Sequence, residues 1–250
     1  MNLQQRRASA ALKNLFVADA LAMPVHWYYN PLDIEKAFPG GISRLQAAPE
    51  YHPASIMSLH STAKGGRGEQ ASHGRQREVV GEVILKGRRK YWGVTNQHYH
   101  RQMQAGENTL NAHCARVVMR TLQDNAGRYD KQSFLDDYID FMTADPPRHP
   151  DTYAESYHRG FFANLESGKE KDRCGAVTHD TPSIGGLVTI APLVLSERLQ
   201  GLPLFEVQKH CLEHLFLTHP DKELGHVCTV YVELLDALLF CDQAQSPHEL

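Results

Sequence analysis

The stretch SIGGLVTIAPLVLSERL, residues 183–199, is apolar on nearly every side. A helix that is hydrophobic all round is usually buried between other elements rather than laid on a surface. Thr181-Pro182, just before it, is typical of a capping residue followed by a first-turn proline. The stretch therefore predicts a central helix that begins at this Thr-Pro pair.

Most of the remaining chain has the three- and four-residue apolar spacing of amphipathic helices. Asn30-Pro31 is typical of the start of a short helix that ends at Pro39. We find no internal repeat and no alternation of strands with helices, so the pattern predicts an all-α, compact single-domain helical bundle over residues 1–250. The apolar stripes lie in residues 12–23, 110–122, 134–142, 153–165, 204–216 and 224–238.

Residues 59–105 break this pattern and predict one long irregular loop, in which only VVGEVIL (79–85) resembles a strand. Residues 59–101 contain nine Lys or Arg against three Glu, so the loop is locally basic. Loops of this length in compact domains are usually functional or disordered. A solvated, mobile loop and a lid that contacts a phosphate are both consistent with this composition, and the first is the commoner outcome.

The overall composition argues against several classes of protein. A formal net charge of -3 gives no bulk attraction to nucleic acid or anionic membranes. The five cysteines are odd in number and never spaced C-x-x-C, so we expect reduced core residues rather than disulfides or a zinc ribbon. The start MNLQQRRASAALKNLF is too polar for a secretory signal, and no stretch approaches the uninterrupted apolar length of a membrane span. We expect a cytoplasmic protein.

A single carboxylate interrupts the apolar stripe of the first predicted helix. In FVADALAMPVHWYYN, residues 16–30, Asp19 lies on the same face as Leu15 and Met23, and His26 and Trp27 follow the helix. Asp19 should therefore face the core or a cleft, which raises the question of what it binds there.

A second polar cluster lies in the stripe at residues 153–165. Asp151, Glu155 and His158 share one helical face, and Glu-x-x-His is half of the pattern that binds two irons in helical bundles. The second half of that pattern is absent from the sequence. Thr152-x-x-Glu155 is also an ordinary capping box, which is the interpretation we favour.

Two further motifs are weighed in the same way. His210 and His214 have the spacing of a zinc-binding helix, but Cys211 follows where a metalloprotease has its glutamate, so we expect surface histidines. THDTPS, residues 178–183, is the richest polar cluster and precedes a predicted helix start, where free N–H groups favour anions. Capping alone would explain Asp180 and Thr181, and the two interpretations have about equal weight.

Four segments together resemble the ADP-ribosylglycohydrolase family, and in particular its crystallin J1 and selenoprotein J-like branch. They are ADALAMPVHW (18–27), GENTLNAHCARVVMRTL (106–122), SIGGLVTIAPLVL (183–195) and THPD (218–221), in the family's order. The resemblance implies a compact all-α domain. It also implies cleavage of the bond between ADP-ribose and a protein side chain with a pair of Mg²⁺ ions held mostly by carboxylates.

The resemblance fails at the metal-binding positions. Asp19 is retained, but His26 stands where family hydrolases have a glutamate, and residues 108–111 read Asn-Thr-Leu-Asn where the family has Thr-Asp-Asp-Thr. No Asp-x-Asp occurs, and Ile184 and Thr189 replace an amide and a guanidinium of the family pattern. We therefore expect no metal ligand here, and we expect that the C-terminal part of the family domain is missing.

These observations define the expected site and function. We expect hydrolysis of an ADP-ribosyl or related glycosidic linkage, with ADP-ribose or an ADP-ribosylated protein as partner and the oligomeric state left open. The alternatives are a catalytically inactive module that binds ADP-ribose or a nucleotide, and a crystallin-like structural protein. Catalytic candidates are His26, Asp19, His179 and Asp180, and substrate-binding candidates are Trp27, Asn108, Thr109, Asn111, Thr181, Ser183, Gly185 and Gly186.

Overall fold

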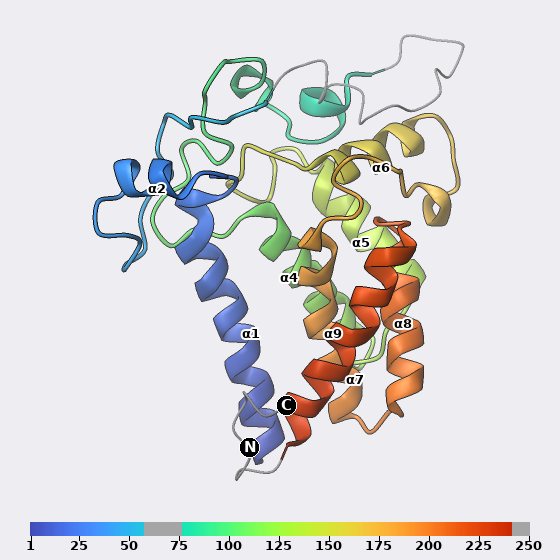
Figure 1. Ribbon diagram of the computed structural model, residues 1–250. Coiled ribbons are helices and arrows are strands. Elements are labelled where there is room, and N and C mark those ends of the chain that lie inside the picture. The colour runs from blue at the N-terminus through green and yellow to red at the C-terminus, as the bar shows by residue number, and fades with distance from the viewer. Residues whose placement is uncertain (58–76, 242–250) are drawn as a thin grey trace.

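The computed structural model describes residues 1–57 and 77–241, and in these ranges the chain is built from helices joined by irregular segments (Figure 1). No strand occurs in the described residues, where two isolated bridges are the only β pairings. The predicted all-α class is confirmed. The elements are α1 (Leu3–Ala22), η1 (Met23–Val25), α2 (Pro31–Ala37), η2 (Val79–Val83), η3 (Arg89–Tyr91), α4 (Leu110–Asp124), α5 (Lys131–Thr143), α6 (Ser156–Glu166), η4 (Lys171–Arg173), η5 (Ile184–Thr189), α7 (Ile190–Leu199), α8 (Leu204–Phe216) and α9 (Lys222–Phe240).

Helix α7 lies at the centre of the bundle, as its uniform apolarity predicts. It packs against α4, α8 and α9 and also touches α1, and its residues Ile190 and Val194 are fully buried. The predicted starting point is wrong. The chain first forms the short helix η5 with Ser183 at its N-cap, because the Thr181 hydroxyl turns inward and donates to the carbonyl of Ala176 instead of capping a helix.

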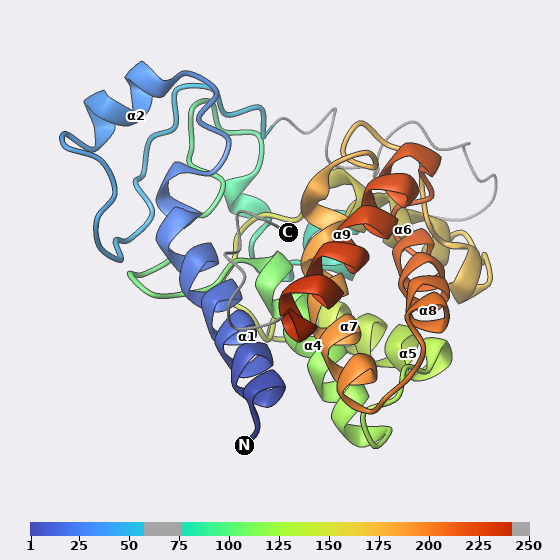
Figure 2. The same cartoon turned by 60° about the horizontal axis from the view of Figure 1, so that its bottom comes forward.

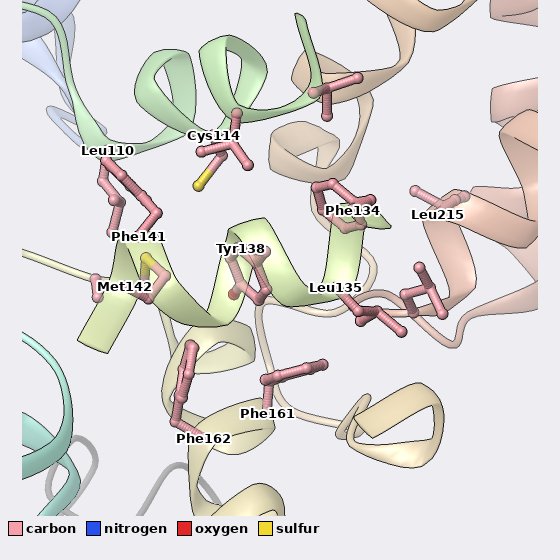
Figure 3. Close-up of a cluster of buried hydrophobic side chains, with 14 of the residues drawn as sticks. Leu110, Cys114, Phe134, Leu135, Tyr138, Phe141, Met142, Phe161, Phe162 and Leu215 are labelled. Atoms are coloured by element: carbon pink, nitrogen blue, oxygen red, sulfur yellow. The ribbon is translucent and has the colours of Figure 1, made fainter. Parts of the chain in front are cut away.

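A cluster of buried hydrophobic side chains surrounds α5 (Figure 3). Tyr138 stacks on Phe134, with ring centroids 5.7 Å apart, and meets Phe161 of α6 edge-on at 5.2 Å. Full burial of each such side chain contributes about 1.5–3 kcal/mol. All five cysteines are free thiols, and four of them are buried, which agrees with the prediction of reduced core residues.

Helix α1 runs along the outside of this bundle and contacts α4, α7 and α9 (Figures 1 and 2). The predicted apolar stripe is only partly covered: Met23, which follows α1, is buried, whereas Leu15 and Asp19 keep intermediate exposure. The C-terminal half of α1 therefore forms the wall of an open cleft rather than a buried core element.

By length and composition alone, Leu3–Val25 is long and apolar enough to cross a membrane, with a mean hydropathy of 1.2. This corrects the expectation that no stretch approaches the apolar length of a membrane span. That expectation gave too much weight to the charges at the start of the helix. One such helix near the N-terminus is weak evidence, because core helices and signal sequences meet the same criterion.

The segment VVGEVIL is not a strand. Residues 79–83 form a single wide turn in which the N–H of Ile84 donates to the carbonyl of Val79, and Gly81 takes a φ of +101°. The valines are buried against α6 because the turn folds their side chains to one side. A short apolar run is equally consistent with a buried turn, which explains the error.

Basic residues in the described part of the long loop are held by the protein itself. Arg77 pairs with Glu166, Arg89 pairs with Glu78, and the Arg88 guanidinium donates to the backbone carbonyls of residues 149–151. Residues 77–105 are thus fastened to the bundle rather than freely solvated. Residues 58–76, on which the lid and mobile-loop hypotheses largely depend, lie outside the described residues.

Candidate functional site

The carboxylate of Asp19 binds the start of α4. Its Oδ2 accepts hydrogen bonds from the backbone N–H of Thr109 at 2.8 Å and from the Asn108 amide at 3.0 Å. Its Oδ1 accepts one from the Thr109 hydroxyl at 2.6 Å. The first N–H groups of a helix lack intrahelical partners and carry partial positive charge, so an anion is favoured there. Asp19 therefore joins α1 to α4.

A second carboxylate, Asp151, binds the same helix start one residue further on. Its Oδ2 accepts from the N–H of Leu110 at 2.8 Å, and its Oδ1 accepts from Nδ1 of His100 at 2.8 Å and from the N–H of Tyr153 at 3.0 Å. Burial opposes the charge of Asp151, but His100 and these donors outweigh that effect and lower the pKa of Asp151 to about 2. Asp151 is a buried, ionised anchor.

His100 connects this anchor to His26. The Nε2 of His100 lies 2.9 Å from Nδ1 of His26, so Asp151, His100 and His26 form one hydrogen-bonded chain, which we name the Asp-His-His relay. With His100 neutral, its Nδ1 donates to Asp151 and its Nε2 accepts the proton of His26 Nδ1. That tautomer leaves a lone pair on Nε2 of His26. Burial, with help from His100, lowers the pKa of His26 to about 3, so the ring is unprotonated at neutral pH.

The pKa of Glu155 is shifted in the opposite direction from that of His26. It occupies the N-cap position of α6, is buried, and approaches the Asn111 amide nitrogen at 3.5 Å, while Tyr157 donates to the Asn111 carbonyl oxygen at 2.8 Å. Burial and the nearby negative charge of Asp180 raise the pKa of Glu155 to about 7. Near neutral pH this carboxyl therefore holds a proton about half of the time.

His26 and Glu155 meet in a cleft of about 460 Å³, a volume in the usual range for small-molecule sites. The cleft lies between the C-terminal half of α1, the start of α4 and helix η5. Both residues also line a small inner pocket beside it, together with His100 and Asp151. The predicted site residues that line the cleft are Asp19, His26, Trp27, Thr109, Asn111, Ser183 and Gly185.

The remaining predicted residues lie outside this cleft. Asp180 accepts from the backbone N–H and hydroxyl of Ser156 at 2.7 and 2.6 Å, so it caps α6 from behind. His179 pairs with Asp180 but is more than half exposed, and Thr181 is buried beneath the same turn. Asn108 lies behind Asp19, and Gly186 lines a separate small inner cavity.

Two interpretations of polar motifs are corrected by these contacts. Thr152 and Glu155 form no capping box, because α6 begins only at Ser156 and the Thr152 hydroxyl donates to the carbonyl of Tyr99. His214 is buried rather than at the surface, with its Nε2 3.0 Å from the Thr189 hydroxyl. Both side chains are held by segments distant in sequence, which local spacing does not reveal.

The donors at the start of α4 do not suit the magnesium pair of the resembled family. Mg²⁺ prefers six oxygen ligands in near-octahedral geometry, usually including carboxylates. Leu110 offers none, and the Thr109 hydroxyl and the Asn111 oxygen are already hydrogen-bonded. In the part of the chain that the structure describes, no group of three or more His, Cys, Asp or Glu is arranged to hold a metal ion.

The cleft lies in an all-α domain, and comparison with known proteins identifies the family of this domain. Residues 1–249 match the family model described as ADP-ribosylglycohydrolase, and the chain therefore belongs to the ADP-ribosylglycohydrolase family, whose members in general hydrolyse ADP-ribosyl linkages. No curated protein and no solved structure gives a significant match.

Sequence reasoning missed the role of three groups, Glu155, His100 and Asp151. The shared helical spacing of Asp151 and Glu155 was a usable signal, although the residues between them are not helical. Nothing local marked His100, since its partners lie 51 and 74 positions away.

Proposed function

We propose that this protein hydrolyses an ADP-ribosyl or related glycosidic linkage, with Glu155 as general acid and His26 as general base. The observation that carries the proposal is the shared cleft, which is lined by a carboxyl whose pKa is raised to about 7 and by an imidazole whose pKa is lowered to about 3. Pairs of groups whose environments push their pKa values apart are typical of acid and base catalysts.

The bond changes follow from these protonation states. Water attacks the anomeric carbon while the bond from that carbon to the leaving nitrogen or oxygen breaks. The Glu155 carboxyl donates its proton to the leaving group, and Nε2 of His26 takes a proton from the attacking water. In the described part of the chain, no hydrogen bond occupies that Nε2. The sugar then leaves with a hydroxyl group, and both residues regain their starting states by proton exchange with solvent.

The Asp-His-His relay has a positioning role in this scheme. It holds the His26 ring in the tautomer that faces the cleft, and the Asp151 charge stabilises the positive charge that develops on the imidazole. His100 and Asp151 do not touch the substrate. Because the donors at the start of α4 do not suit Mg²⁺, no step of the proposed reaction passes through a metal ion.

A second candidate is a catalytically inactive protein of the crystallin J1 and selenoprotein J-like branch, either binding ADP-ribose or a nucleotide or purely structural. Two sequence features favour it: the His26-Trp27-Tyr28 sequence, and the neutral Leu110 and Asn111 at the start of α4. The acid–base pair in the cleft favours the hydrolase. A cytoplasmic location and a monomeric or dimeric state are compatible with either candidate.

The test is product release by the full-length protein. Arginine- and serine-linked ADP-ribosylated peptides and simple ribosides are incubated with wild type, Glu155→Gln and Glu35→Gln, in EDTA and in Mg²⁺. We expect release by wild type and by Glu35→Gln, an exposed matched control, and loss in Glu155→Gln. Release that is absent from every substrate would contradict the hydrolase and favour the second candidate, whereas equal release by Glu155→Gln would contradict the assignment of Glu155 as the general acid.

A further inference from the structure

Backbone N–H groups that open toward the cleft are already occupied by carboxylates of the protein. At the start of α4, Thr109 donates to Asp19 and Leu110 donates to Asp151, each at 2.8 Å. A helix N-terminus is a common place for a phosphate, because its free N–H groups and its dipole attract anions. Here these N–H groups already donate to carboxylates of the protein, so a bound phosphate would have to displace one of these side chains.

The next helix start has the same arrangement. The N–H of Ser156, at the first position of α6, donates to Asp180 at 2.7 Å. This helix begins directly after Glu155, which lines the cleft. The amide that would otherwise face an incoming anion there is also taken by a carboxylate.

The charged side chains of the cleft are acidic. Asp19 and Glu155 line it, and the described residues contribute no Lys or Arg to its wall. Arg116 of α4 is not part of the cleft wall: its guanidinium donates to the Asn108 oxygen at 2.8 Å and lies over the Phe16 ring at 4.6 Å. A diphosphate placed among these groups would meet carboxylates of like charge, and residues 1–57 and 77–241 offer no compensating cation in the cleft wall.

The rest of the wall suits an aromatic and hydroxylated ligand. Trp27 has a φ of +59°, a rare conformation for a large residue, and its ring is held 4.7 Å from Tyr99 and 5.1 Å from Tyr153. Such strain persists only where surrounding contacts enforce it, and it is often found at ligand sites. Beside it, Ser183 lines the cleft, and its buried hydroxyl has no hydrogen-bond partner in the described structure.

We propose that the cleft binds a phosphate-free N-riboside, with its base against Trp27 and its ribose between Glu155 and Ser183, in preference to the diphosphate-bearing ADP-ribose. This inference rests on the proposed glycoside hydrolysis and narrows its substrate class. When the bond to the anomeric carbon breaks, a neutral base such as adenine takes the Glu155 proton and leaves as the free base, whereas a cationic base such as nicotinamide keeps the bonding electron pair and leaves neutral without a proton. In both cases the attacking water supplies the hydroxyl group of the ribose.

The test is calorimetric titration of full-length Glu155→Gln, which binds without turnover, with adenosine, inosine, nicotinamide riboside and ADP-ribose. We expect at least one riboside to bind tenfold or more tightly than ADP-ribose. Trp27→Leu should weaken riboside binding by about tenfold. Ile184→Arg places a cation at the exposed rim of the cleft and should strengthen ADP-ribose binding by about tenfold relative to riboside binding.

Each outcome of this titration has a clear meaning. ADP-ribose binding that equals or exceeds riboside binding would overturn the inference, as would the absence of binding by every riboside. Selective riboside binding without hydrolysis by wild type would refute the proposed activity and leave the selectivity standing. Hydrolysis of ADP-ribosylated peptides combined with tight ADP-ribose binding would support the proposed activity and refute the preference for ribosides.

Discussion

Oδ1 of Asp19 accepts a hydrogen bond from the Thr109 hydroxyl at 2.6 Å, and its Oδ2 accepts one from the Thr109 backbone N–H at 2.8 Å. Ninety positions separate these residues in sequence. The carboxylate in the apolar stripe of α1 is thus a cap that α1 supplies to α4 from outside that helix. It fixes the relative position of two walls of the cleft, and for this reason we regard Asp19 as a structural residue of the site.

Replacing Asp19 with Asn should destabilise the protein by about 1–3 kcal/mol. An amide keeps one acceptor for Thr109 but turns an N–H₂ group toward other donors, so part of the cap is left unpaired. Urea denaturation measures the free energy of unfolding. Asp124→Asn, at an exposed position on the same α4, is the matched control and should change it by less than about 0.5 kcal/mol. Equal stability of the two variants would show that the Asp19 cap has no energetic role.

Glu155→Gln should become more stable than wild type as the pH rises. The pKa of Glu155 is raised from 4.5 to about 7 in the folded protein, so the folded state binds its proton more tightly than the unfolded state. Wild-type stability therefore falls between pH 4.5 and pH 7 and stays reduced above pH 7, whereas the amide has no such dependence. The advantage of Glu155→Gln should grow across that window to on the order of 3 kcal/mol.

Thermal and urea denaturation of Glu155→Gln and wild type at pH 5, 6, 7 and 8 check this expectation. Glu35→Gln, an exposed substitution, should run parallel to wild type. A constant difference between Glu155→Gln and wild type at all four pH values would mean that Glu155 ionises normally.

Substituting His100 with Asn should reduce kcat by about 10- to 100-fold with little change in KM, because the relay orients His26 without touching the substrate. Loss of the relay should also move the acidic side of the pH–rate profile, since the protonation of His26 would no longer be coupled to His100 and Asp151. A general loss of structure would not produce such a displacement. His52→Asn is the control: His52 is buried and bonds the backbone carbonyl of His26 rather than its ring. Identical profiles for the two variants would contradict the positioning role.

Gly185→Ala should lower kcat by tenfold or more. A methyl group at this position would lie 2.9 Å from Oε2 of Glu155 and 3.3 Å from the Ser183 hydroxyl, so the carboxyl must shift within the cleft. Gly225→Ala is the matched control, since its methyl would meet the Phe216 ring at 2.9 Å, outside the cleft lining. Both variants should lose some stability. Only Gly185→Ala should also lose activity, because only its methyl group displaces the Glu155 carboxyl.

The sequence was a good guide wherever a short-range rule decides the structure. Asn30 caps the short helix α2 as Asn-Pro predicts, and the uniformly apolar segment around Ile190 is central. Asp19 was expected to face the core or a cleft, and it lines the cleft together with His26, whereas His179 lies outside it. Helix starts were less accurate: the Thr181-Pro182 start is not used, and Ser183 holds the N-cap position of η5 instead. Several side chains can satisfy the same free N–H groups, so local sequence does not select one.

The rest of the site depends on long-range contacts. Glu155 resembled a capping residue, and its raised pKa arises from burial and from Asp180 on a separate turn. His100 is one of 15 histidines in the chain, and only folding places it between Asp151 and His26. Spacing rules describe neighbours along one helix, whereas this chain of three side chains crosses three separate segments.

The pH dependence of kcat/KM for glycoside hydrolysis, measured with wild-type protein from pH 5 to pH 9, tests the acid–base assignment most directly. Because Glu155 must be protonated to act, we predict that the rate falls as the pH rises through about 7, and that this decline is absent from the residual activity of Glu155→Gln. A wild-type rate that stays level or keeps rising up to pH 9 would contradict the assignment of Glu155 as the acid.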